Sequence, residues 1–119
     1  MLEGDWQIQS VDYGGEALPD RHGQLQILAG RFSLQIAGTP RQVGSVELDH
    51  AAEPAPALDL VWHESGAETR RLRAIVRVRG ELMQFCYYPD AALPRPAAFA
   101  STGVPPAILV RCRRVNPAG

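Results

Sequence analysis

Residues 71–88 read RLRAIVRVRGELMQFCYY, and this stretch decides the fold. From residue 71 to residue 79, every second side chain is apolar. Ile75 is the one break in the intervening polar face, which otherwise holds Arg71, Arg73, Arg77 and Arg79. Gly80-Glu81 then forms a two-residue turn, and residues 82–88 alternate again. This period of two predicts a β-hairpin that packs one face against a core.

The same alternation recurs in short segments along the whole chain, separated by turn residues. It predicts eight strands, at residues 5–12, 24–28, 31–36, 42–49, 57–63, 71–79, 82–88 and 107–114. Short connections favour an up-and-down order, and eight strands can close on themselves so that no edge stays open. We therefore expect one all-β domain over residues 1–119, a single up-and-down antiparallel eight-stranded β-barrel. Residues 18–23 and 97–101 leave room for a short helix.

The composition is that of an ordinary globular domain, with 45% hydrophobic and 21% charged residues in 119. Every basic residue apart from the histidines is arginine, which together with frequent Ala, Gly and Pro is typical of a GC-rich bacterial genome. No apolar run is long enough to span a membrane, and the start of the chain lacks the pattern of a signal peptide. We expect a soluble, cytoplasmic protein with no membrane contact. The sequence leaves open whether a leader peptide was removed from its start.

Charge is divided unevenly along the sequence. Residues 1–69 hold three arginines and eleven acidic residues, a net charge of −8, whereas residues 70–119 hold nine arginines and two acidic residues, a net charge of +7. The last three strands are neighbours in an up-and-down barrel, so one side should be basic. The face with Arg71, Arg73, Arg77 and Arg79 is expected to be solvated and paired across strands, with a protein partner as the alternative. Nucleic acid is disfavoured because no aromatic residues are interleaved as a stacking platform.

The two ends of the chain carry a closure signature. Gly4-Asp5-Trp6 opens the first strand, and the last strand carries Arg111, Arg113 and Arg114. Tryptophan is large enough to plug one barrel end, and a guanidinium on its face gains cation–π energy. We expect Trp6 to be this plug, with Arg113 or Arg114 against its ring.

Several motifs occur together in a recognisable order: GDWQI at 4–8, GEALP at 15–19, LDL at 58–60, GELMQFCY at 80–87 and RPAAF at 95–99. With these motifs the chain resembles a bacterial family of uncharacterised lipocalin-like domains that is abundant in planctomycetes. This chain departs from that family at Ala74-Ile75-Val76, where the family tends to have Gly-Ile-Tyr, and at Gly80-Glu81, where it tends to have Gly-Asp. The resemblance implies a calycin-type, lipocalin-like barrel and supplies no established activity, so no catalytic residue is carried over.

Candidate chemistry is sparse. His22, His50 and His63 are scattered without the spacing of metal ligands, and no serine stands in a nucleophile motif. Asp59 alternates with two leucines, so it should point outward and pair with an arginine. We expect neither an enzyme nor a metal site, and no cofactor.

The predicted inward residues are almost wholly apolar: Trp6, Ile8, Leu25, Ile27, Phe32, Leu34, Val46, Leu48, Leu60, Trp62, Val76, Val78, Met83, Phe85, Tyr87, Ile108 and Val110. Such an interior could hold a small apolar ligand. In that case Trp62, Phe85 and Tyr87 are the expected walls. Phe99, from the proline-rich loop 89–106, is expected to cover one mouth, with Arg95 pinning that loop. The alternative is a structural or protein-interaction domain whose barrel is filled by its own side chains.

Strand parity also orients the two cysteines. Cys86 falls on the outward face of its strand and Cys112 on the inward face of the last strand. Side chains on opposite faces of a sheet cannot meet the geometry of a disulfide. Both thiols are therefore expected to be free.

Overall fold

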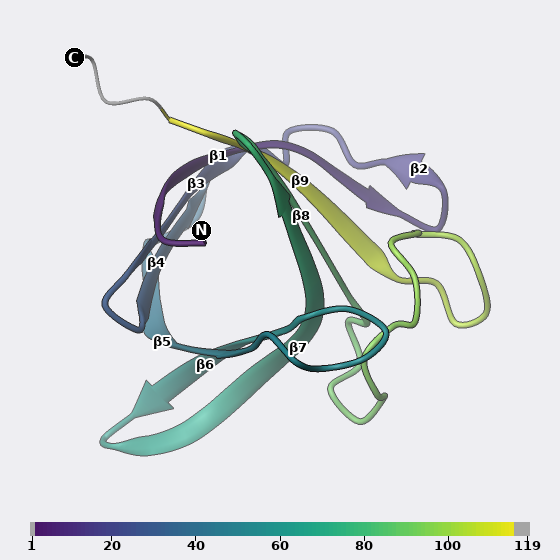
Figure 1. Cartoon of the computed structure of the whole chain (residues 1–119). Helices are drawn as coiled ribbons and strands as arrows, with labels where there is room; N and C mark the ends of the chain where they lie inside the picture. The colour runs from purple at the N-terminus through teal and green to yellow at the C-terminus, as the bar shows by residue number, and fades with distance from the viewer. Residues whose placement is uncertain (1, 116–119) are drawn as a thin grey trace.

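The structure, a computed structural model, describes residues 2–115. Within them the chain forms nine β-strands (Figure 1): β1 (Gly4–Tyr13), β2 (Glu16–Ala17), β3 (Gly23–Leu28), β4 (Arg31–Ile36), β5 (Gln42–Asp49), β6 (Ala57–Glu64), β7 (Ala67–Arg79), β8 (Leu82–Tyr87) and β9 (Ile108–Arg114). The eight predicted strands are confirmed with small changes at their ends. The additional strand β2 is two residues long.

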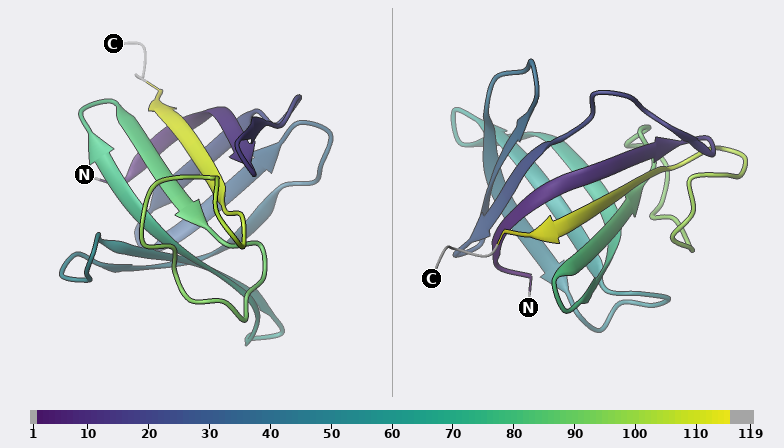
Figure 2. Two further views of the ribbon diagram at one scale, coloured as in Figure 1. Left: turned by 90° about the vertical axis from the view of Figure 1, so that its right-hand side faces the viewer. Right: turned by 90° about the horizontal axis from the view of Figure 1, so that it is seen from above.

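Each strand pairs antiparallel with its neighbour in the chain, and β1 also pairs with β9, which closes the sheet (Figures 1 and 2). The short strand β2 lies outside this ring and pairs only with the end of β1. The fold is therefore the expected up-and-down barrel of eight strands, of the lipocalin-like kind. The described chain contains no helix, so residues 18–23 and 97–101 are loops, and no helix there could cross a membrane.

The barrel interior is one apolar cluster. Every residue of the predicted inward set is either buried in it or packed against it, because period-two alternation sends those side chains to one face of the wall. The cluster also includes Val11, Leu58, Leu72, Ala74 and Cys112. Alternation therefore determines which face of each strand points inward, except in β1, where a register shift between Ile8 and Ser10 turns Val11 inward as well.

A second apolar cluster lies on the outer face of the wall. It consists of the buried residues Ile75, Cys86, Ala107 and Leu109. The loop between β8 and β9 runs over the outside of these strands, as the left view of Figure 2 shows, and Phe99 packs against the cluster. Ile75, which breaks the arginine face in the sequence, is thus buried beneath this loop.

The two chain ends meet at the plug. The side chain of Trp6 is fully buried, and its Nε1 donates a hydrogen bond to the carbonyl oxygen of Leu2 at 2.9 Å. The Arg114 guanidinium lies over the indole, with 4.2 Å between Cζ and the ring centroid. Gly4 has φ +140°, and a Cβ there would lie 2.5 Å from Arg114 Nη1. The backbone conformation therefore favours glycine at this position, and the missing side chain also leaves room for the Arg114 guanidinium.

Arg113 plays no part in this plug. It points away from Trp6 by strand alternation and lies 3.7 Å from Glu81, with both side chains largely exposed. Of the two arginines considered for closure, only Arg114 is on the ring.

Truncating the plug should destabilise the barrel. Trp6→Ala removes a fully buried indole and leaves a cavity, so we expect a loss of about 3–5 kcal/mol in the free energy of unfolding. Urea unfolding followed by circular dichroism measures this loss, with Arg113→Gln as the surface control. A loss below about 1 kcal/mol would contradict the role of Trp6 as a plug.

Both cysteines are free and buried, on opposite faces of the wall. Burial raises the pKa of Cys112 to about 12, and burial also raises the pKa of Cys86, whose Sγ donates to the carbonyl oxygen of Ala100 at 3.5 Å. Thiolate, the reactive form, is therefore scarce at neutral pH.

We expect slow thiol chemistry in the folded protein. At pH 8, about one Cys112 side chain in ten thousand is a thiolate, given its raised pKa. An aromatic disulfide reagent should titrate almost no thiol in the native state and both thiols after unfolding in guanidinium. Intact mass under non-reducing conditions provides the check. A native Cys86–Cys112 disulfide would mean that the register of β8 or β9 is wrong.

Candidate functional site

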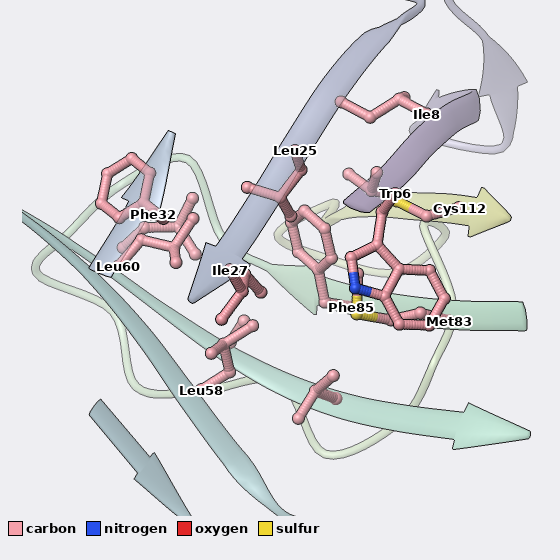
Figure 3. Packing of buried hydrophobic residues seen from close by; sticks show 14 of the residues in the cluster. Trp6, Ile8, Leu25, Ile27, Phe32, Leu58, Leu60, Met83, Phe85 and Cys112 are labelled. Carbon is pink, nitrogen blue, oxygen red and sulfur yellow. The ribbon is translucent and has the colours of Figure 1, made fainter. Parts of the chain in front are cut away.

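The barrel is packed at its middle and hollow at both ends. Ile27, Phe85 and Met83 belong to the cluster that fills the middle, and Figure 3 shows their side chains converging between the strands, next to that of Trp6. On either side of this packed layer lies a separate hollow, and the two have no lining residue in common. The interior is thus neither an open channel nor completely filled.

The first hollow, which we call the Tyr87 cavity, has a volume of about 250 Å³. It lies at the end of the barrel where β8 ends and β9 begins. Its lining is apolar apart from Arg21 and the Tyr87 phenol: Ile8, Val11, Leu18, Arg21, Leu25, Leu34, Ile36, Leu60, Leu72, Phe85, Tyr87, Ile108 and Val110. Most of its apolar walls are buried strand residues, so the cavity reaches into the core.

The second hollow, the Leu2 cavity, has a volume of about 450 Å³ and lies at the opposite end, beside the plug. It is lined by Leu2, Glu3, Ile27, Gly30, Val46, Leu48, His50, Pro56, Val76, Arg77 and Val78. Only Ile27 and Val76 among these are buried. The Leu2 cavity is therefore a shallower depression despite its larger volume.

Arg21 is the one charged residue in the lining of the Tyr87 cavity. Burial raises the pKa of Tyr87, and the positive charges of Arg70 and Arg21 act against that rise. Arg70 stacks on the indole of Trp62, with 4.6 Å between Cζ and the ring centroid. The Tyr87 ring stacks on Phe85 at 6.2 Å between centroids. The Tyr87 cavity is thus apolar except for one arginine and one phenol.

Two of the four predicted ligand residues, Phe85 and Tyr87, line this cavity. Trp62 lies in the interior but not in its wall. It packs edge-on against Phe32 at 5.0 Å between ring centroids, and its Nε1 donates to Gln42 Oε1 at 2.9 Å. The indole is therefore already engaged by groups of the chain itself.

The expectation that Phe99 covers a mouth of the barrel is wrong. Phe99 packs on the outer face against the cluster of Ile75 and Cys86, and the Arg77 guanidinium lies over its ring with Cζ 4.3 Å from the centroid. Apolar residues on the outward parity of β7, β8 and β9 hold the loop outside. Phe99 is consequently no part of either hollow.

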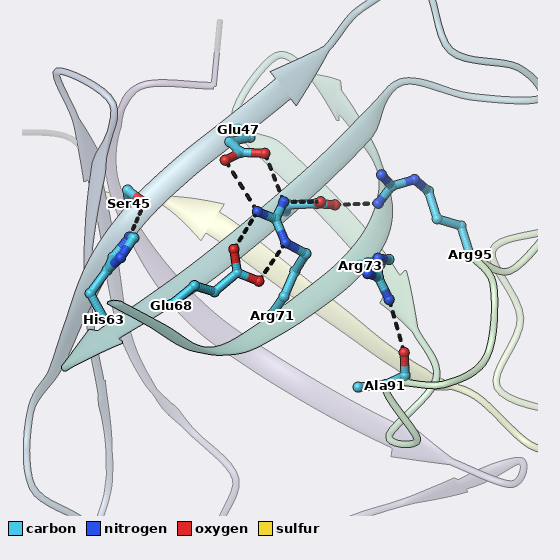
Figure 4. A network of polar contacts seen from close by, with 9 residues as sticks. Ser45, Glu47, His63, Glu68, Arg71, Arg73, Ala91 and Arg95 are labelled. Carbon is cyan, nitrogen blue, oxygen red and sulfur yellow. Dashed lines mark hydrogen bonds and ion pairs between the residues drawn. The ribbon is translucent and has the colours of Figure 1, made fainter. Parts of the chain in front are cut away.

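The loop is fastened by an ion-pair network on the outer wall (Figure 4). Asp59, only 5% exposed, accepts from Arg71 at 2.7 Å and also pairs with Arg95 of the loop. Arg71 contacts Glu47 and Glu68 as well, each at 2.7 Å, and these three carboxylates raise the pKa of Arg71. Asp59 and Arg95 thus make the contacts that the sequence predicted.

The predicted arginine face is largely occupied from within the chain. Besides Arg71, the guanidinium of Arg73 donates to the carbonyl oxygen of Ala91 at 2.9 Å. Arg77 donates to Gln84 Oε1 at 2.6 Å and covers Phe99. Arg71, Arg73, Arg77 and Arg79 therefore do not form one uninterrupted cationic surface.

One pair of side chains resembles a nucleophile and its base. Ser45 Oγ and His63 Nε2 lie 2.8 Å apart on the outer face, and Glu68 is the cross-strand partner of His63. Glu68, however, binds Arg71. Glu68 is therefore not available to orient the imidazole of His63 as the third member of a triad. This pair does not support acyl transfer. Among residues 2–115, no three His, Cys, Asp or Glu side chains gather as a metal site.

Comparison with family models, with curated proteins and with solved structures finds no match for this chain. The resemblance to the planctomycete lipocalin-like family therefore stays a prediction from the sequence motifs.

Sequence reasoning missed the two arginines whose charges act on Tyr87, namely Arg21 and Arg70. Arg70 has the same parity as Leu72, but the expected strand began at residue 71, whereas β7 begins at Ala67. Arg21 lies in the connection between β2 and β3, where alternation carries no information. Extending the alternation of β7 by one pair of residues would have placed Arg70 on the inward face.

Removing the charge of Asp59 should loosen the loop. Asp59→Asn leaves Arg95 without its carboxylate, so we expect a loss of about 1–3 kcal/mol in the free energy of unfolding and faster amide hydrogen exchange in residues 89–106. Glu68→Gln is the matched control, because Glu68 is an exposed member of the same network and should have much less effect. Unchanged exchange in the loop of Asp59→Asn would show that apolar packing alone holds it.

Proposed function

We propose that this protein is a binding module, not an enzyme, and that it holds a small apolar molecule in the Tyr87 cavity. The observation that carries the proposal is an apolar space of about 250 Å³ that the side chains of a closed barrel leave unfilled. The hollow opens to solvent at one end of the barrel, so its apolar walls are in contact with water when it is empty. A ligand would remove this apolar surface from water.

The volume limits the ligand. Apolar cavities of roughly 150 Å³ in other proteins stay dry and bind benzene, whereas drug-sized ligands occupy about 300–1,000 Å³. A cavity of about 250 Å³ lies between these two and fits one ring with a short substituent, or a short aliphatic chain. Burying about 200 Å² of apolar ligand surface contributes about 5 kcal/mol before the cost of association, so we expect a dissociation constant of about a millimolar or weaker.

The Tyr87 cavity is the better candidate of the two hollows because its walls are core residues. Leu25, Leu60, Leu72 and Val110 are all buried strand residues, so a ligand there would be surrounded on most sides. The Leu2 cavity has mostly half-buried or exposed walls and would leave a ligand partly in water.

A structural or protein-interaction domain is the alternative function. The packed layer of Trp6, Met83 and Phe85 supports it, since this part of the barrel is filled by its own side chains. An acidic protein partner could approach the outer face where Arg79 and Arg111 lie together along one shallow groove. We also propose that the chain belongs to the lipocalin-like family and that the protein is cytoplasmic.

Binding of 4-(dimethylamino)benzonitrile, a neutral one-ring dye whose fluorescence depends on the polarity of its surroundings, tests the proposal. We expect saturable binding by the native protein. Val11→Phe places a ring in the Tyr87 cavity and should weaken that binding by about tenfold or more. Val46→Phe, the same substitution in the wall of the Leu2 cavity, is the matched control and should leave it unchanged.

Overpacking costs about 1–3 kcal/mol, so thermal unfolding must show that both variants remain folded. Dye binding lost in Val46→Phe and kept in Val11→Phe would assign the site to the other end of the barrel. No saturable binding by the native protein would leave the structural alternative.

A further inference from the structure

We propose that a groove on the outer face of β7, β8 and β9 binds a small molecule with two or more adjacent phosphate groups. This groove lies outside the barrel and shares no lining residue with the Tyr87 cavity, so the inference does not depend on the function proposed for that cavity.

The groove is built by the register of three neighbouring strands. β8 pairs with β7 on one side and with β9 on the other, so outward side chains of the three strands form rows. Two adjacent rows each have an arginine at both ends: Arg77, Gln84 and Arg111, then Arg79, Leu82 and Arg113. All four arginines line one hollow of about 410 Å³.

The loop between β8 and β9 leaves these two rows open. It covers the row before them, in which Ile75, Cys86 and Leu109 are paired across the strands and buried. In the left view of Figure 2, the loop passes over the end of β8 and the start of β9, and the turn between β7 and β8 stays clear of it. No residue of this loop lines the groove. The groove is therefore a recess bounded by the loop at one end and by that turn at the other.

The two arginines of β7 meet no carboxylate. Within residues 2–115, Arg79 forms no ion pair. Arg77 donates to Gln84 Oε1 at 2.6 Å and covers the ring of Phe99, and both of these partners are uncharged. The positive charge on this side of the groove is therefore not neutralised by the chain.

The two arginines of β9 have carboxylate partners outside the groove lining. Arg111 pairs with Asp12 at 2.6 Å, and Arg113 lies 3.7 Å from Glu81 with both side chains largely exposed. No carboxylate lines the groove itself. Four arginines against these two carboxylates leave a net charge of +2, so the groove attracts anions even with both pairs intact.

The spacing of the arginines favours an anion with several charged groups. Two residues along a strand span about 7 Å, and strands two apart in a sheet are separated by about 10 Å, so the four side chains start from the corners of a small rectangle. One phosphate carries about two negative charges near neutral pH and can bind a guanidinium through two oxygens. A chain of two or three phosphates offers enough charge and enough oxygens for arginines on both sides.

Neutral donors complete the groove. Gln84 accepts from Arg77 through Oε1, which leaves its Nε2 as a donor. Gln9 and Ser10 line the groove from β1, where the register shifts against β9. Amide and hydroxyl donors add hydrogen bonds to phosphate oxygens that do not depend on charge alone.

The surroundings of the groove favour a small anion over an acidic protein or a nucleic acid. β6 and β1 flank the three strands, and both belong to residues 1–69, which carry a net charge of −8. A protein interface of about 800 Å² on each partner would extend onto these strands, whereas a short phosphate chain stays within the groove. No aromatic residue lines the groove as a stacking platform for bases.

Inorganic tripolyphosphate and orthophosphate are the probes that test the inference. Each is titrated into the folded protein by isothermal titration calorimetry at the same ionic strength, and we expect tripolyphosphate to bind at least about tenfold more tightly. Arg79→Gln and Arg113→Gln should each weaken tripolyphosphate by about two- to fivefold, as for an exposed charge pair, and the double variant by about tenfold. Neither side chain holds the loop, so thermal unfolding should be unchanged.

Arg31→Gln is the matched control, because it removes the same charge from β4, which pairs with none of the three strands. It should leave the affinity for tripolyphosphate unchanged. An equal loss in Arg31→Gln and Arg79→Gln would show that binding follows net charge and would overturn the inference. Hexaglutamate that binds as tightly as tripolyphosphate would assign the groove to an acidic protein, and no binding of tripolyphosphate would leave the groove without its ligand; either result also overturns the inference.

Discussion

The whole molecule depends on the pairing of its first long strand with its last. β1 exchanges hydrogen bonds with β3 on one side and with β9 on the other, and without the second pairing the sheet would have two open edges. Trp6 and Arg114 are Cα partners in that pairing, so the residue that fills the end of the barrel and the residue that covers it are brought together by the same register. The register of β1 against β9 therefore determines both the closure of the sheet and the packing at this end of the core.

The sequence specifies the wall of this barrel well because the wall obeys a local rule. Alternation is set by the geometry of each strand, so it survives without knowledge of distant contacts. Asp59 could be assigned to an outward arginine pair, and Cys86 to the face opposite Cys112, on that basis alone.

The loop and the cavity depend on contacts that no local rule contains. Phe99 is an apolar residue in a long loop, and either the mouth of the barrel or its outer face could bury it. It packs on the outer face because Ile75, which lies 24 positions earlier in the sequence, points outward from its strand and provides an apolar contact there. The cavity is equally non-local. The volume of the cavity is the volume enclosed by the eight strands minus the volume of the side chains inside. Strand tilt sets the first volume, and the side-chain rotamers determine where the remaining space lies.

The loop that follows β8 is fastened to the outside of the wall, and none of its residues lines the Tyr87 cavity. Phe99 and Arg95 of this loop are therefore not placed to cover the cavity. The segment nearest the mouth is the short connection that carries Leu18 and Arg21 between β2 and β3. Such connections move in nanoseconds to microseconds, far faster than the millisecond closure of a large lid. Exchange at this site should consequently be fast, and a complex would last only as long as its few contacts hold it, which suits a carrier or sensor that tracks the free concentration of its ligand better than a store that retains it.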